Sequence, residues 1–296
     1  MKNWLELDIP SMKEILEDRE ISAVVGEMLG NVLCHLGISG EKNSGLIGRI
    51  LLLAKGESLL DYELYAHTLL EEFKVTSLIP AKLVNRAELA FSQVLPFVNA
   101  GRILDFGCGD GRIGLLLSKK GNDVVLADIY KNSNIDATSL PFALFNPSKN
   151  VPFEDNSFDT TLALTVFHHC SNPLHAIRDV HRVTKKGGKA IVIESVYGVT
   201  KEMTGGKIGK NAENYLLLDA EKQRKVNIFF DHFYNRVIHY STSEKSKVNV
   251  PFNFNTPAGW KKVFEKEGFA EEKAIHLGVD QPAVPEYHTL HVLRKL

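Results

Sequence analysis

The chain lacks several features that would mark particular classes of protein. Its three cysteines, Cys34, Cys108 and Cys170, are too few and too scattered for a disulfide framework or a C-x-x-C metal site. No uncharged apolar run reaches the ~18 residues of a membrane-spanning helix, and the stretch MKNWLELDIP lacks the apolar core of a signal peptide. These absences predict a cytoplasmic protein without a membrane span.

An excess of charge of either sign is also missing. The 35 Lys and Arg residues are balanced by 36 Asp and Glu residues, which leaves a net charge of −1. Because no bulk positive field attracts polyanions, we expect no nucleic-acid partner. What the chain does have is 296 residues with 44% apolar content, enough to bury the core of one large domain or of one domain with an attachment.

The apolar spacing changes near residue 102. Before it, apolar residues recur at intervals of three and four, which predicts a helical N-terminal region over residues 1–98. The segments expected to be helical are 21–37, 45–54, 61–73 and 81–98, with Gly37, Gly40, Gly45 and Pro80 as breakers between them.

From residue 99 to 296, short apolar runs alternate with amphipathic stretches, which predicts an α/β domain with a Rossmann-like, seven-stranded, mostly parallel sheet. The expected strands are 102–107, 123–129, 141–146, 159–167, 189–195, 271–278 and 287–295, and the helices between them are 111–120, 173–186 and 257–267. Residues 196–255 interrupt this rhythm and are interpreted as an insertion after the fifth strand. Within it, TGGKIGKN (204–211) has the composition of a hinge for a lid.

The stretch ILDFGCGDGRIG (103–114) places a glycine-rich turn directly after the first predicted strand. In an open parallel sheet this turn lies at the ligand crevice, and glycines allow tight positive-φ geometry and close approach of a ligand to the backbone. The spacing is D-x-G-x-G-x-G rather than the dinucleotide fingerprint G-x-G-x-x-G. Asp105 and Asp110 would repel a pyrophosphate, whereas a ligand with an amino group and a sulfonium would be attracted.

The second predicted strand ends at Asp128, where a carboxylate can accept hydrogen bonds from both hydroxyls of a ribose. A solvated acid at a strand end is the simpler alternative.

With these motifs the chain resembles the class I S-adenosylmethionine-dependent methyltransferases, in the branch of the ubiquinone/menaquinone C-methyltransferase-like enzymes. The resemblance runs over residues 100–195 and 251–296, and rests on ILDFGCGDG, VVLADI, VPFEDNSFDTTLALTVFHHC and DVHRVTKKGGKAIVIE. It implies S-adenosylmethionine as the cofactor. The residues that it assigns to the cofactor site are Asp105, Gly107, Gly109, Gly111, Asp128, Ile129, Asn146, Thr165 and His168. Asn146 departs from the family, which usually has Asp at that position.

The chemistry expected from this resemblance is an in-line methyl transfer, in which alignment and exclusion of water provide most of the acceleration. A base is needed only if the acceptor must lose a proton. The candidate catalytic residues are His169, Glu194, His232 and Tyr234. The aromatic run FFDHFYNRVIHY (229–240) is suited to one wall of an acceptor pocket, although its phenylalanines equally suit the core face of a helix. We expect no metal site, since the histidine spacings fit one poorly.

The sequence thus predicts a methyltransferase for a small organic acceptor, methylated on O, N or C. The helical region 1–98 is expected to cover the acceptor or to form a homodimer. The alternatives are a methyltransferase for protein or RNA, and a scaffold that binds the cofactor without transferring a methyl group.

Overall fold

The computed structural model describes residues 7–205, 212–242, 247–279 and 285–296. The chain divides into two compact units. The first, called here the helical unit, consists of Met1–Lys82, Ser195–Pro257 and His276–His288, and the second, the sheet unit, of Leu83–Glu194, Ala258–Ile275 and Thr289–Leu296. Most of the predicted hinge 204–211 lies outside the described residues.

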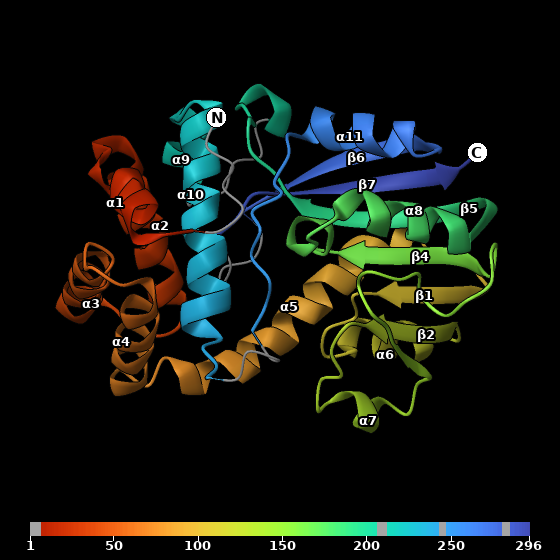
Figure 1. Cartoon of the computed structure of the whole chain (residues 1–296), viewed down its shortest axis with the longest axis horizontal. Helices are drawn as coiled ribbons and strands as arrows, with labels where there is room; N and C mark the ends of the chain where they lie inside the picture. Colours follow the sequence, from red (N-terminus) through yellow and green to blue (C-terminus); the bar gives the residue numbers. More distant parts are fainter. Residues whose placement is uncertain (1–6, 206–211, 243–246, 280–284) are drawn as a thin grey trace. The chain divides into compact units, whose positions relative to one another are not determined.

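The sheet has seven strands in the order β3-β2-β1-β4-β5-β7-β6. Their bounds are β1 Arg102–Phe106, β2 Asp123–Asp128, β3 Phe142–Leu144, β4 Phe158–Leu164, β5 Thr184–Ser195, β6 Phe269–Gly278 and β7 His288–Lys295. The pairs from β3 to β5 are parallel, whereas β7 runs opposite to β1 and β4 (Figure 1). The predicted Rossmann-like, mostly parallel, seven-stranded sheet is confirmed.

The predicted helices 111–120, 173–186 and 257–267 are present, but the second ends at Val183, where β5 begins, and a short helix at 135–138 was not predicted. Their bounds are α6 Arg112–Ser118, α7 Ile135–Thr138, α8 Pro173–Val183 and α11 Pro257–Lys266. Asn172 caps α8 by accepting a hydrogen bond from the His175 N–H, and Pro173 occupies the first turn, where its missing N–H costs nothing.

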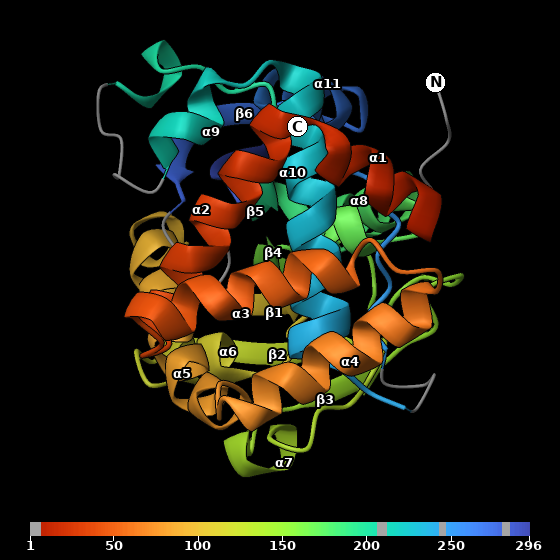
Figure 2. The same cartoon turned by 90° about the vertical axis from the view of Figure 1, so that its left-hand side faces the viewer.

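The helical unit joins the N-terminal helices to the insertion after β5. The N-terminal helices are α1 Ile9–Glu17, α2 Arg19–His35, α3 Gly40–Leu53 and α4 Leu59–Glu72. Helix α5 Ile79–Val94 follows them in the chain, but from Leu83 onward it belongs to the sheet unit. The insertion contributes α9 Glu213–Leu217, α10 Ala220–His232 and the π-helix η6 Phe233–Ile238. Helix α10 packs against α1 and α2, and η6 packs against α4, as Figure 2 shows for α10 behind the N-terminal helices. Lys222 of α10 pairs with Asp18 and Glu20 at the start of α2.

Two helix boundaries in this unit differ from the prediction. Helix α1 was not among the predicted segments; Asp8 caps it through the Ser11 N–H, and Pro10 lies in its first turn. Helix α3 begins at Gly40, so Gly45 is an interior helical residue rather than a breaker. Burial of Leu46 and Ile50 stabilises a helix that the glycines alone disfavour.

No helix in the described ranges is both long and apolar enough to cross a membrane. The cytoplasmic location and the homodimer stay predictions.

Gly114 sets the distance between α6 and the sheet. A Cβ at this position would lie 2.4 Å from Leu126 Cδ2 and 3.2 Å from Val124 Cγ1 of β2. Leu126 is fully buried and cannot turn away into solvent. Helix α6 can therefore lie this close to β2 only if residue 114 of the helix is glycine.

Gly114→Ala is expected to lower the free energy of unfolding by about 1–3 kcal/mol, because α6 or Leu126 must shift. The matched control is Gly48→Ala in α3, where a Cβ meets nothing within 4 Å and should add about 0.5–1 kcal/mol. Urea unfolding of both variants measures the difference. Equal effects of the same sign would show that α6 does not need the glycine.

Candidate functional site

The three glycines of the turn between β1 and α6 all have positive φ angles but face different surroundings. At Gly107 (φ 72°) a Cβ would lie 2.6 Å from Val166 Cγ2, and at Gly111 (φ 74°) it would lie 2.9 Å from Ile135 Cδ1. At Gly109 (φ 54°) a Cβ would meet nothing within 4 Å. Contacts within the protein thus account for two of the glycines, and Gly109 alone leaves bare backbone beside open space.

Asp128, at the end of β2, ties the neighbouring strand to this turn. Its Oδ2 accepts a hydrogen bond from the Gly109 N–H at 2.8 Å, and its Oδ1 accepts from the N–H groups of Ile129 at 2.7 Å and Tyr130 at 3.3 Å. Burial raises the pKa of the Asp128 carboxyl, and the three amide donors oppose that rise. The carboxylate therefore holds the turn in shape while remaining beside the open space at Gly109.

Asp105 is a buried carboxyl beneath the turn, with 3% of its surface exposed. Burial and the nearby charge of Asp128 raise its pKa from 3.8 to about 7, although the Gly114 N–H donates a hydrogen bond to it. Its Oδ2 has no hydrogen-bond partner among the described residues. A buried, incompletely paired carboxyl group lowers the stability of the fold, and such groups are often found at functional sites.

Two residues that the resemblance assigns to the cofactor site, Ile129 and Asn146, lie after β2 and β3. Ile129 is 52% exposed and Leu144 is 60% exposed, so both offer apolar surface to a planar ring. The Asn146 Oδ1 accepts hydrogen bonds from the N–H and Oγ of Ser148, at 2.9 and 2.8 Å. The carbonyl oxygen that would receive an adenine amine is therefore already used, and Asn146 remains the weakest of the predicted contacts.

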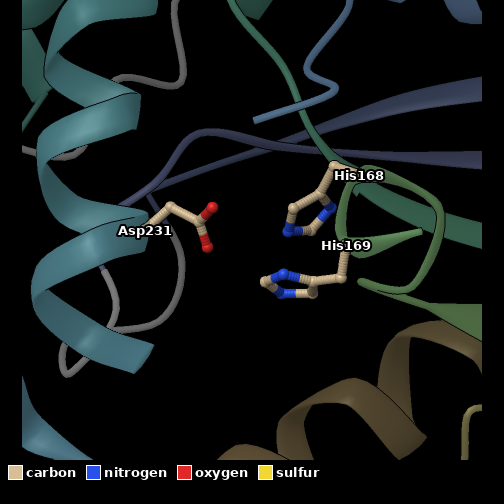
Figure 3. Close-up of side chains that lie close together, drawn as sticks. All are labelled: His168, His169 and Asp231. Atoms are coloured by element: carbon tan, nitrogen blue, oxygen red, sulfur yellow. The ribbon is translucent and has the colours of Figure 1, made fainter. Parts of the chain in front are cut away.

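The chain leaves β4 through a strained residue and a short 3-10 turn. Thr165 has φ 57°, which is rare for a β-branched side chain and concentrates at functional sites. The turn Phe167–His169 follows, and Figure 3 shows the imidazole rings of His168 and His169 on it, with ring centroids 4.0 Å apart. Both histidines thus stand directly after β4, where the sequence analysis places them.

Glu194, near the end of β5, is fully buried and contacts this turn. Its Oε1 accepts hydrogen bonds from the N–H groups of Val166 (3.2 Å) and Phe167 (2.7 Å), and its Oε2 lies 2.5 Å from His168 Nδ1. Burial raises the pKa of Glu194 to about 7. The sequence analysis names Glu194 among the catalytic candidates, but no sequence signal predicts these partners.

The other two catalytic candidates, His232 and Tyr234, belong to the helical unit. His232 is buried, stacks on Tyr62, and its Nε2 lies 3.3 Å from Oε1 of Glu63. Burial lowers the pKa of His232 to about 3, so the ring is neutral near pH 7. It lies beside η6, and π-helical turns occur frequently at functional sites.

Asp231, also drawn in Figure 3, precedes His232 on α10 and accepts a hydrogen bond from Asn235 Nδ2 at 2.7 Å. How His232 and Tyr234 relate to His169 and Glu194 stays a prediction, because the two pairs lie in different units.

Comparison with known proteins finds relatives for part of the sheet unit. Residues 104–192 match the family model described as a methyltransferase domain. An uncharacterized methyltransferase of Mycobacterium tuberculosis is 36% identical over 103 residues, which cover 34% of this chain and 42% of the relative. A ubiquinone/menaquinone biosynthesis C-methyltransferase of Rickettsia felis is 31% identical over 119 residues, which cover 35% of this chain and 48% of the relative. The chain thus spans less than half the length of the curated relatives it matches.

A solved structure supports the fold. The crystal structure of an S-adenosylmethionine-dependent methyltransferase of Thermotoga maritima aligns with a TM-score of 0.50 and 19% identity, over 77% of this chain and 98% of that one. The resemblance that the sequence predicts is therefore confirmed: residues 104–192 match a methyltransferase domain, and the sheet has the fold of the solved methyltransferase.

The raised pKa of Asp105 predicts a pH dependence of stability. Between about pH 4 and 7 the folded protein keeps a proton that the unfolded chain has released, so the free energy of unfolding falls as the pH rises through this range. Asp105→Asn removes this contribution and should stabilise the protein at pH 8 but not at pH 4. Thermal unfolding of both proteins at the two pH values measures it, and an equal difference at both values would contradict the raised pKa.

Proposed function

We propose that the protein transfers a methyl group from S-adenosylmethionine to a small organic acceptor. The observation that carries this proposal is the turn at residues 107–111, where the bare backbone of Gly109 is bound to the carboxylate of Asp128, and the buried carboxyl of Asp105 lies close enough to Asp128 for their charges to interact. It lies within the segment that matches a methyltransferase domain.

The charges of this turn fit the cofactor. S-adenosylmethionine carries an ammonium and a sulfonium, both of which two nearby carboxylates attract, whereas a pyrophosphate would be repelled. A bound cation would also favour the charged form of Asp105, and so offset the cost of its burial. The Oδ2 of Asp128 accepts one backbone hydrogen bond, from the Gly109 N–H, and has a further lone pair for a ribose hydroxyl, whereas its Oδ1 already accepts from the N–H groups of Ile129 and Tyr130.

The cofactor supplies an already activated methyl group. The chain's own residues then need to bind the two substrates, orient them and exclude water. The strained backbone at Thr165 and the histidines of the following turn are the groups of the sheet unit that we assign to the reacting end of the cofactor. His169 is the candidate for removing a proton from an acceptor that must lose one. His232, whose pKa burial lowers to about 3, is a weak base and, like Tyr234, is a candidate for binding the acceptor.

A small acceptor is supported by two observations. The Rickettsia felis relative is named for a quinone pathway, which concerns small organic molecules. The near-neutral charge of this chain offers no field for an RNA substrate.

Label transfer tests the proposed function. The full chain is incubated with S-adenosylmethionine labelled in its methyl group and with an extract that contains metabolites, RNA and protein. We expect label in the small-molecule fraction. Label in precipitated protein or RNA would contradict the small acceptor, and saturable binding of the cofactor without any transfer would indicate a scaffold.

Gly109→Val is expected to abolish binding of S-adenosylhomocysteine, because the branched side chain would fill the open space beside the backbone. The matched control is Gly121→Val, which also has a positive φ angle (89°) and nothing within 4 Å, but lies before β2. Both variants should lose about 1–3 kcal/mol of stability through backbone strain. Calorimetry separates them, and normal binding by the Gly109 variant would mean that the ligand lies elsewhere.

A further inference from the structure

The carboxylate of Glu194 collects hydrogen bonds from one short segment of chain. Besides the bonds to Val166 and Phe167 and the contact with the His168 ring, its Oε2 lies 3.4 Å from the His168 N–H. The donors thus come from three successive residues of the turn that leaves β4. A carboxylate that accepts two or three backbone N–H groups acts as a fixed anchor for that backbone.

Both oxygens of Glu194 are engaged in this way, and the side chain is fully buried. Burial of a carboxylate is unfavourable unless hydrogen bonds or charges compensate for it. Three backbone N–H groups offset part of that cost here, and the His168 ring contacts Oε2, so both oxygens are engaged and neither is directed at an acceptor. A role in holding the turn accounts for its contacts better than a role as a base.

The anchored turn is also in contact with the glycine turn. Val166 carries the first of the Glu194 hydrogen bonds, and its methyl groups fill the space where a Cβ of Gly107 would lie. Thr165, immediately before it, has the strained φ angle of 57°, and such strain persists only where surrounding contacts enforce it. The N–H of Thr165 bonds to the carbonyl of Ile193, next to Glu194, at 2.6 Å.

We propose that Glu194 is a positioning residue, whose carboxylate fixes residues 165–168 in the conformation that contacts the cofactor and supports the glycine turn through Val166. This inference rests on the proposed function, since the cofactor is what the turn is held for. It assigns Glu194 an indirect role in place of proton transfer.

The test compares Glu194→Gln and Glu194→Ala with Asp179→Asn in the full chain. Asp179 is a buried acid of the same unit that accepts a hydrogen bond from the Val151 N–H at 2.6 Å and pairs with Arg182, so it controls for the loss of a loop-holding carboxylate. Calorimetry with S-adenosylhomocysteine is done at a temperature at which every variant is folded. We expect Glu194→Ala to raise Kd about ten- to a hundredfold, and Glu194→Gln, which keeps one acceptor oxygen, to raise it less.

Two results would overturn the proposal. One is equal affinity of the wild-type protein and both Glu194 variants, which would reduce Glu194 to a source of stability. The other is an equal loss of affinity in Asp179→Asn, which would make the effect a general one.

Amide hydrogen exchange without ligand tests the anchor independently of the cofactor. Glu194→Gln should speed exchange at residues 166–168, and Asp179→Asn should speed it at Val151 instead. If the wild-type protein does not bind S-adenosylhomocysteine, the proposed function fails, and the exchange result alone decides whether Glu194 holds the turn. Unchanged exchange at 166–168 in Glu194→Gln would contradict the anchor.

Discussion

The sheet unit depends on carboxylates that lie at or near the carboxyl ends of its strands and are held by backbone amides. Asp105 of β1 accepts from Gly114, Asp128 of β2 from Gly109, and Glu194 of β5 from Phe167. Each bond ties a strand to a turn beyond the sheet or to the helix that follows it. Burial of these acids is unfavourable without such partners. A movement of the turns would therefore leave a carboxyl group without its backbone hydrogen bonds, which costs free energy.

This arrangement sets stability against function. Burial raises the pKa values of Asp105 and Glu194 to about 7, so near neutral pH the unit contains carboxyl groups that a simple structural protein would replace with apolar side chains. A cationic ligand would favour the charged forms. We infer that the negative potential at the strand ends is retained for the cofactor, and that the cofactor in turn stabilises the turns around it.

The sequence predicted the sheet unit better than the helical unit, for physical reasons. Strands buried on both faces and a glycine-rich turn leave local signals that do not depend on distant residues, so all seven strands were found. Helix α3 was predicted to begin too late because tertiary burial of Leu46 outweighs the intrinsic cost of Gly45. The residues that contact Glu194 lie more than twenty positions away in the sequence, and no motif or periodicity links them to it. Likewise, only the packing of α6 shows why position 114 must be glycine.

The central claim is that the carboxyl groups of Asp105 and Asp128, at the ends of β1 and β2, select a positively charged sulfur nucleoside over a phosphorylated coenzyme. Calorimetry with S-adenosylmethionine and with NAD, on the wild-type protein and on variants of the two acids that bound β2, tests it most directly. We predict binding of S-adenosylmethionine only, weakened by about 1.5–3 kcal/mol in Asp128→Ala and unchanged in Asp123→Ala, whose exposed acid lies at the opposite end of the strand. Tighter binding of NAD, or an Asp128→Ala variant that binds S-adenosylmethionine normally, would contradict the account.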